Sequence, residues 1–310
     1  MTGTIALTGA TGFIGAAVAR RLAVDGWQVR ALVRRSSPRM RWTEFSGEWV
    51  EGDLQDEDSL RRLVVGAEAV VHCAGAVRGA SRNQFNSVNV DGVARLVRAG
   101  LAQHRVPRFL LMSSLAAREE HLSSYASSKR DGERALAEAA GEMEWIALRP
   151  PAVYGPGDRE ILPLFRWIER GIAPVLGSSS ARFSLLYVED LAEAVVRWLE
   201  CRNHERAAFE LHDGQPHGYS WNDLVATAAR VCARRVLRVP VPPLVLHLAG
   251  GVNLAAATIF GYSPMLTTGK VRELRHPDWV CDNAALNRAT GWGPRVGLEE
   301  GLRRTLEERD

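Results

Sequence analysis

Two reactive side chains, Tyr125 and Lys129, stand four positions apart in the segment YASSK. Residues at i and i+4 share one face of a helix, so a helix here would place the phenol beside the ammonium. A free tyrosine titrates near pH ~10, and a neighbouring positive charge lowers that pKa toward neutrality. The spacing therefore indicates proton transfer by Tyr125, with Lys129 supplying the charge. The pattern alone also fits a half-buried tyrosine beside a solvated lysine.

A glycine-rich turn, TGATGFIG at residues 8–15, directly follows the apolar run TIAL and precedes an amphipathic segment. Glycines permit a tight turn and close approach of the backbone to a phosphate, and the free amides at a helix start attract negative charge. Strand, turn and helix follow one another in the order that dinucleotide binding needs. We therefore expect these residues to contact a dinucleotide: Gly9, Thr11, Gly12, Phe13, Ile14 and Gly15.

The elements that must position these residues form a regular series. Short apolar runs at residues 4–10, 27–33, 69–75, 108–114 and 144–150 alternate with amphipathic stretches. This βαβ series predicts the α/β fold class, with a doubly wound parallel (Rossmann) sheet and ligands at the carboxyl ends of its strands. We expect residues 1–160 to be mainly the dinucleotide-binding domain. Residues 161–310 are then mainly a smaller carboxyl-terminal substrate-binding portion, interwoven with the sheet.

The TGxxGxxG turn and the YxxxK segment resemble those of the extended short-chain dehydrogenase/reductase family, also called the NAD-dependent epimerase/dehydratase family, over nearly the whole chain. The resemblance implies that Lys129 holds the nicotinamide ribose. It also implies cofactor contacts at strand ends, where helix caps at Asp53 and Asn89 and a turn at Gly75 are the structural alternatives. The implied contacts are Asp53, Leu54, Cys73, Ala74, Gly75, Ala76, Val77, Asn89, Ser113, Tyr125, Lys129, Pro150, Pro151 and Val153.

The serines Ser113 and Ser114 end the run RFLLMSS, where this family carries a hydroxyl that hydrogen-bonds the reacting oxygen. The resemblance assigns this role to Ser114, with Ser113 as the fallback, and a serine pair that merely ends a strand is the alternative. Ser114, Tyr125 and Lys129 would then direct hydrogen bonds at an oxygen whose charge changes during hydride transfer. Further along, Asp190 resembles the family residue at a helix start, where we expect it to cap the helix.

The end of the second strand bears on the choice of cofactor. NAD-specific relatives carry an aspartate there for the adenosine ribose, whereas this chain has Arg34, Arg35 and Ser36. A guanidinium makes charge-assisted hydrogen bonds to a 2′-phosphate, which a carboxylate would repel. We therefore predict NADP as the cofactor, with NAD as the alternative if the arginines are merely solvated.

The segment between the serines and Tyr125 narrows the choice among the reactions that this family catalyses. It is shorter than in sugar-nucleotide epimerases, and Leu115 and Ala116 stand where dehydratases carry an Asp-Glu pair, which argues against a dehydratase. The tail from residue 270 resembles dihydroflavonol-reductase-like and sterol-dehydrogenase-like members, which act on hydrophobic carbonyls or alcohols. We predict an NADP(H)-dependent oxidoreductase interconverting an alcohol and a ketone or aldehyde. The alternatives are a nucleotide-sugar epimerase that retains NAD(P), with Arg182 and Arg272 on the diphosphate, and a non-catalytic cofactor-binding protein.

Composition argues against several other classes. The 39 basic and 36 acidic residues give a net charge of +3, so we expect a small-molecule substrate and no nucleic acid. The four cysteines lack metal-binding spacing, so we expect no metal. The stretch 243–261 is apolar for nearly the width of a bilayer, but Gly250, Gly251 and two polar residues interrupt it. We expect it to form helices that wall a pocket or an interface and not to act on a membrane, in a cytoplasmic protein that the resemblance implies is a homodimer.

Overall fold

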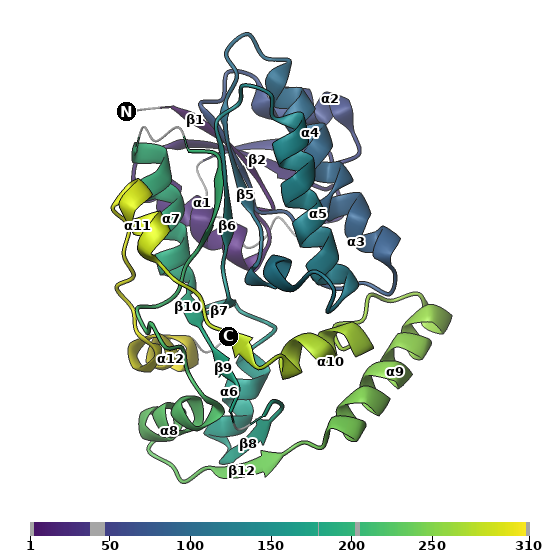
Figure 1. Ribbon diagram of the computed structural model, residues 1–310. Coiled ribbons are helices and arrows are strands. Elements are labelled where there is room, and N and C mark those ends of the chain that lie inside the picture. The colour runs from purple at the N-terminus through teal and green to yellow at the C-terminus, as the bar shows by residue number, and fades with distance from the viewer. Residues whose placement is uncertain (1–2, 38–46, 179, 202–204, 308–310) are drawn as a thin grey trace.

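The structure, a computed structural model, describes residues 3–37, 47–178, 180–201 and 205–307. Its centre is a seven-stranded parallel sheet in the order β11-β6-β5-β4-β1-β2-β3 (Figure 1). The strands are β1 (Thr4–Thr8), β2 (Gln28–Val33), β3 (Glu48–Glu51), β4 (Ala69–His72), β5 (Arg108–Met112), β6 (Trp145–Arg149) and β11 (Ala207–Glu210). The central β4 is buried along its whole length, as expected for a parallel strand covered on both faces.

Helices cover both faces of this sheet and enclose two separate cores. On one face, α1 (Phe13–Val24) packs against α7 (Val188–Glu200), with α11 (Ala284–Thr290) beside it. On the other face lie α2 (Glu57–Val64), α4 (Asp91–Leu101) and α5 (Ser124–Ala139), with α3 (Arg82–Asn89) packed on α4 and α5. The predicted doubly wound Rossmann sheet is confirmed. Its strand order reverses between β1 and β4, which is where such sheets bind ligands.

A smaller part of the molecule lies below the carboxyl ends of the strands in Figure 1. Its core is built by α6 (Leu162–Glu169), α8 (Trp221–Val231) and α12 (Leu298–Glu307). Three two-stranded parallel sheets join it: β7 (Ala152–Tyr154) with β10 (Leu185–Tyr187), β8 (Ile172–Val175) with β12 (Leu237–Pro240), and β9 (Arg182–Phe183) with β13 (Asp278–Trp279). Because β11 comes later in the chain yet completes the large sheet, the two parts interleave.

Two consecutive helices, α9 (Pro243–Phe260) and α10 (Thr268–Arg275), form the lower right arm of Figure 1. The sequence predicts several helices in this apolar stretch, but the structure has one continuous helix running through Gly250 and Gly251. It ends at Gly261, whose φ of +71° gives the left-handed turn typical of a helix terminus. Among the described residues, α9 is the one helix long and apolar enough to cross a membrane, and only 17% of it is buried.

Candidate active site

The glycine-rich turn between β1 and α1 leaves room only for backbone. Gly9 has a φ of +73°, and a Cβ on Gly15 would lie 2.1 Å from the carbonyl oxygen of Gly9. Gly12 is the N-cap of α1 and offers no side chain to satisfy the first amides of the helix. Free amides, a helix start and the absence of side chains form a cradle that fits a pyrophosphate.

The loop that follows β4 packs directly against this turn. A Cβ on Gly9 would lie 2.5 Å from the backbone nitrogen of Ala74, so the two loops touch. The Thr8 hydroxyl accepts a hydrogen bond from that nitrogen at 3.2 Å and shares a 2.7 Å hydrogen bond with Nδ1 of His72. Burial and then the charge of Lys129 lower the pKa of His72 to about 3, so this imidazole is neutral near pH 7.

Asn89 fixes the shape of the same loop. Its Oδ1 accepts from the Ala76 amide at 2.8 Å, and its Nδ2 donates to the Ala76 carbonyl at 3.0 Å and to the Ser128 hydroxyl at 2.8 Å. A Cβ on Gly132 would lie 2.1 Å from the Asn89 carbonyl oxygen, so this glycine lets α5 approach the end of α3. Asn89 therefore holds the loop 73–77 against α5. Burial raises the pKa of the Cys73 thiol to about 12, which keeps it protonated and inert.

The predicted catalytic side chains Ser114, Tyr125 and Lys129 come together at the carboxyl ends of β4 and β5. The Ser114 hydroxyl caps the 3₁₀ helix η2 (Leu115–Glu119) and lies close enough to the Tyr125 hydroxyl to lower its pKa. Lys129, one turn along α5, donates to the Met112 carbonyl at 2.9 Å. A Cβ on Gly75 would lie 3.0 Å from the Lys129 nitrogen, so this glycine lets the loop 73–77 approach the buried ammonium closely.

Ser113 lies away from this group. Its hydroxyl donates to Glu133 at 2.5 Å in the interior, and Glu133 also accepts two hydrogen bonds from Arg149 at 2.8 and 2.6 Å. Because its donor is used in this buried network, Ser113 serves to join β5, α5 and β6. Ser114 is thus the serine that faces Tyr125.

The charge that acts on Tyr125 comes from a residue that the spacing did not predict. Burial raises the pKa of Tyr125, and the Ser114 hydrogen bond and then the charge of Lys270 lower it. The Lys270 ammonium lies 5.6 Å from the centre of the Tyr125 ring. Lys129 was expected to play this part, but its ammonium is turned to the Met112 carbonyl, and burial lowers its own pKa to about 8.

Lys270 is held in place by the helix that carries Tyr125. Its ammonium pairs with Glu273 at 2.8 Å, and Glu273 accepts a hydrogen bond from Ser123, the N-cap of α5. Burial lowers the pKa of Lys270, but the nearby Glu273 carboxylate raises it by more. The net effect is a raised pKa, so the ammonium stays charged. The chain contains only two lysines, Lys129 and Lys270, and both lie at this site. The scarcity of lysine is the one signal in the sequence that could have pointed to Lys270.

A cavity of about 110 Å³ opens beside Tyr125, between the start of α5, the loop after β4, and the α9–α10 arm. Its apolar walls include Phe85, Leu254 and Met265, and its polar groups include Tyr125 and Lys270. Phe85 packs edge-on against the Tyr125 ring, with 6.1 Å between the ring centres. The cavity therefore presents the Tyr125 hydroxyl and two cations, Lys270 and Arg272, beside an apolar wall, which suits a ligand with both polar and apolar parts.

The other predicted contacts are spread along the same edge of the sheet. Arg34, Arg35 and Ser36 follow β2 and are exposed, and Arg35 pairs with Glu51 at 3.1 Å. The exposed Asp53 accepts from the Gln55 amide at 2.7 Å. Leu54 packs on Gly92. The Pro150 carbonyl accepts a hydrogen bond from the Leu115 amide at 2.8 Å. Pro151 is half-buried, and Val153 lies in β7.

Two basic residues considered for a diphosphate have other partners. Arg182 in β9 pairs with Asp223 at 3.4 Å, and Arg272 lines the cavity while donating to the Leu122 carbonyl at 2.6 Å. Arg272 therefore braces α10 against the start of α5.

Comparisons with known proteins agree with this geometry. The NAD dependent epimerase/dehydratase family matches residues 5–209. The chain is similar to the ceramide reductase of Caulobacter vibrioides, with 39% identity over 98% of this chain and 94% of the relative. It is similar to the 2-alkyl-3-oxoalkanoate reductase of Stenotrophomonas maltophilia, with 28% identity over 97% of both chains.

Among solved structures, the UDP-glucose 4-epimerase of Thermotoga maritima with UDP-glucose has the same fold, with a TM-score of 0.77 and 21% identity over 98% of this chain and 97% of that one. Family, relatives and fold agree that the protein is an NAD(P)-dependent oxidoreductase or epimerase. The chain belongs to the NAD dependent epimerase/dehydratase family, the extended short-chain dehydrogenases/reductases.

Proposed function

We propose that the protein is an NADP(H)-dependent reductase of a long-chain ketone, acting through Ser114, Tyr125 and Lys129. The observation that carries the proposal is the meeting of Ser114 and Tyr125 beside a cavity that has an apolar wall, formed by Phe85, Leu254 and Met265, and also contains Lys270. A hydroxyl pair of this kind can hold a carbonyl oxygen and exchange a proton with it.

In the direction of reduction, Tyr125 donates its proton to the carbonyl oxygen while Ser114 orients that oxygen by a hydrogen bond. The bound nicotinamide supplies the hydride that the carbonyl carbon receives. Lys129 keeps one donor on the Met112 carbonyl and has others on the side of Gly75, where they would hold the ribose. The opposite reaction returns the alcohol proton to Tyr125.

The substrate class follows from the cavity and the relatives together. Phe85, Leu254 and Met265 suit alkyl chains, and Lys270 suits a second oxygen close to the carbonyl that is reduced. The two named relatives are reductases of a ceramide and of a 2-alkyl-3-oxoalkanoate. We therefore place the substrate among branched long-chain 3-oxo compounds that carry an amide or carboxylate oxygen.

The test compares three substrates with the purified protein and NADPH: a 3-oxo ceramide, a 2-alkyl-3-oxoalkanoate and UDP-glucose. We expect one mole of NADPH to be oxidised for each mole of either ketone reduced, and no net change with UDP-glucose. Conversion of UDP-glucose to its epimer, without net change in nicotinamide absorbance and without ketone reduction, would establish the second candidate, a nucleotide-sugar epimerase.

The preference for NADP(H) rests on the exposed Arg34 directly after β2, where a guanidinium can pair with a 2′-phosphate. Arg34→Asp removes one charge-assisted hydrogen bond and adds a repelling charge. We expect it to weaken NADPH binding by roughly 10–100-fold while NADH binding changes little. Fluorescence titration of both cofactors measures the ratio.

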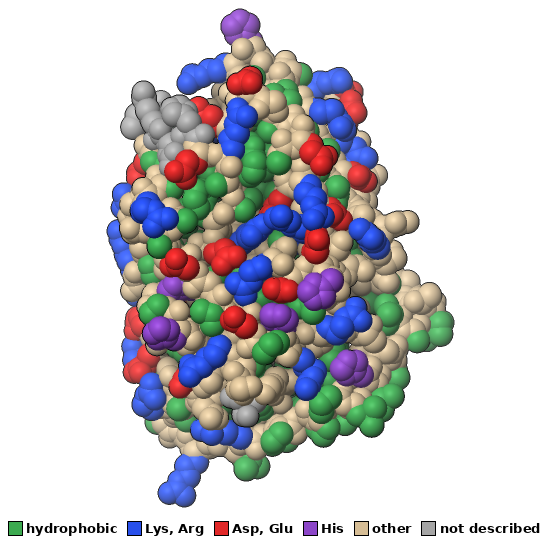
Figure 2. All heavy atoms as spheres, in the orientation of Figure 1, with side chains coloured by type: hydrophobic (Ala, Val, Ile, Leu, Met, Phe, Trp, Pro, Cys, Tyr) green, Lys and Arg blue, Asp and Glu red, His purple; other side chains and the backbone are tan. Residues whose placement is uncertain are grey.

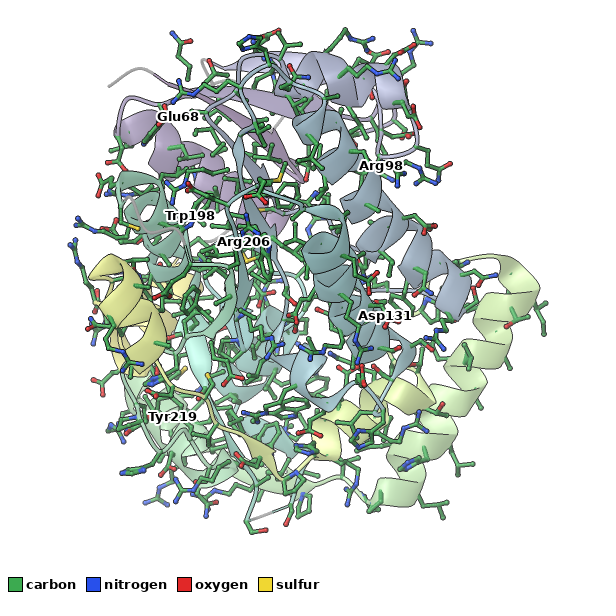
Figure 3. The ribbon with its side chains drawn as sticks, turned by 45° about the horizontal axis from the view of Figure 1, so that its top comes forward. Glu68, Arg98, Asp131, Trp198, Arg206 and Tyr219 are labelled. Atoms are coloured by element: carbon green, nitrogen blue, oxygen red, sulfur yellow. The ribbon has the colours of Figure 1, made fainter. Side chains whose placement is uncertain are left out.

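The matched control is Arg98→Asp on α4, an exposed arginine remote from β2 that Figure 3 labels. This variant makes the same change in net charge and should leave the ratio of the two affinities at the wild-type value. Equal affinities of the wild-type protein for NADPH and NADH would refute the preference.

A further inference from the structure

The outer face of α9 is an exposed apolar stripe. It consists of six side chains that are each 52–77% exposed: Leu244, Val245, Leu248, Val252, Ile259 and Phe260. At about 100° per residue these positions fall within an arc of roughly 160°, so they form one continuous face. In Figure 2 hydrophobic side chains gather at the lower right, where this arm lies. A patch of this kind marks an interaction surface.

The stripe continues onto neighbouring segments. Leu237 and Val239 of β12 and Tyr262 after α9 are also exposed. Of the 15 exposed large hydrophobic side chains among the described residues, nine lie within residues 237–262. The exposure is therefore concentrated in one region of the surface.

The inner face of α9 is used by the protein itself. Leu246, Gly250 and Ala257 are buried, and Asn253 donates to the Leu266 carbonyl at 2.8 Å. Leu254 lines the cavity beside Tyr125. The helix thus forms a wall with the cavity on one side and the apolar stripe on the other.

The arm cannot cross a bilayer in this fold, because both ends of α9 are attached to the same body. On one side β12 pairs with β8. On the other side α10 is tied to the start of α5 by the Ser123–Glu273 and Arg272–Leu122 hydrogen bonds. A spanning helix would place these two attachments on opposite sides of the membrane, so α9 can only lie on a surface.

The charges around the stripe favour a bilayer over another protein. Residues 239–269 contain no Asp, Glu, Lys or Arg. Three exposed arginines, Arg234, Arg235 and Arg238, precede this span. A protein partner would need polar groups around the apolar centre to fix its orientation, whereas a bilayer needs only apolar area and nearby positive charge.

We propose that α9 docks flat on lipid bilayers that contain anionic lipids, with the stripe at the depth of the acyl chains. Arg234, Arg235 and Arg238 contact the headgroups. This docking brings the outer wall of the cavity to the membrane surface. It stands independently of which substrate the cavity binds.

The test is co-sedimentation of the full-length protein with vesicles of phosphatidylcholine alone or mixed with phosphatidylglycerol. We expect binding to the mixed vesicles, and at least tenfold weaker binding for the triple variant Leu248→Ser, Val252→Ser, Phe260→Ser. The matched control carries Val24→Ser, Val65→Ser and Val106→Ser, which change exposed valines elsewhere and should bind like the wild type. Replacing the three arginines by glutamine should abolish the preference for phosphatidylglycerol.

Circular dichroism and NADPH titration of the triple variant check that its fold and cofactor-binding site are intact. Both should match the wild type, and because neither measures turnover, this result stays separate from the proposed reaction. The proposal would be overturned if the wild-type protein bound neither kind of vesicle. It would also be overturned if the valine control lost as much vesicle binding as the triple variant. A dimer, seen by light scattering, that the triple variant dissociates would overturn it too, because a second copy would then cover the stripe.

Discussion

The hydroxyl of Tyr125 can be tested almost alone, because phenylalanine keeps the ring that packs on Phe85. Tyr125→Phe removes only the transferable proton and the Ser114 hydrogen bond. We expect kcat to fall by roughly 10²–10⁴-fold, with the affinity for the cofactor retained. Steady-state kinetics and cofactor titration measure the two quantities separately.

The control for this variant is Tyr219→Phe, which removes a hydroxyl that donates to Asp213 at 2.8 Å in the other part of the molecule. Tyr219 is labelled in Figure 3. Its kcat should stay close to the wild-type value. Wild-type turnover by Tyr125→Phe would remove this residue from the proton transfer.

The buried Lys129 lowers the stability of the cofactor-free protein, since burial lowers its pKa from 10.5 to about 8. The unfolded chain therefore binds more protons between these pH values, and native stability rises with pH across that window. Below pH 8 the shift corresponds to about 3 kcal/mol of destabilisation. We expect Lys129→Met to be inactive but more stable than the wild type in urea at pH 7.

The same variant has a distinctive dependence on pH. The gap in the free energy of unfolding between Lys129→Met and the wild type should shrink toward zero as pH rises from about 8 to above 10. A gap that is absent at pH 7, or that grows with pH, would contradict the buried-lysine interpretation.

Among the elements, α5 and β6 are joined by one buried ion pair, to which Ser113 after β5 donates a hydrogen bond. Glu133 is 5% exposed and Arg149 14%. Arg149→Met leaves the Glu133 carboxylate buried without its bidentate partner, so we expect a loss of roughly 3–5 kcal/mol in the free energy of unfolding. Urea denaturation measures this loss.

Arg130 offers a matched control, since it contacts the same carboxylate at 3.2 Å from a side chain that is more exposed, at 39%. Arg130→Met should cost less than about 1 kcal/mol, as for other surface pairs. Comparable losses for the two variants would show that Glu133 is not stabilised mainly by Arg149.

The elements of the first half were predictable because each strand or helix carries its own periodic pattern. Ser114 and Tyr125 meet because the end of β5 and the start of α5 lie at the same edge of the sheet, joined by a short connection. The second half lacks that regularity. Asp190 was expected to cap α7, but it accepts from the Arg295 and Val296 amides at 3.1 and 2.9 Å and ties a distant loop to the helix.

The single helix α9 was missed for a related physical reason. Glycine lowers local helix propensity, so a Gly-Gly pair does not by itself predict one continuous helix. In the structure a Cβ on Gly250 would lie 3.1 Å from the Thr267 backbone, so this glycine permits close packing on the segment before α10. That tertiary contact is invisible in the local sequence.

On the scale of the whole molecule, the site is completed by Lys270 from the far end of the chain. Its charge lowers the pKa of Tyr125, so Lys270→Met should raise that pKa. Reduction needs the protonated phenol, and the decline of kcat/KM at high pH should therefore move to higher pH. The pH profile measures the shift, and Lys270→Arg, which retains the charge, should keep the wild-type profile. An unmoved decline in Lys270→Met would show that Lys270 does not act on Tyr125.

The position of β11 has a consequence for how the chain is made. During synthesis the first six strands of the sheet are complete once residue 149 has left the ribosome, but β6 then has a free edge. Its partner, residues 207–210, appears only after the intervening elements β7 to α7 have been synthesised. Unpaired edge strands invite pairing with other chains. The nascent protein therefore passes through a period in which the free edge of its nearly complete nucleotide-binding half can associate with other chains. That period ends when β11 pairs with β6.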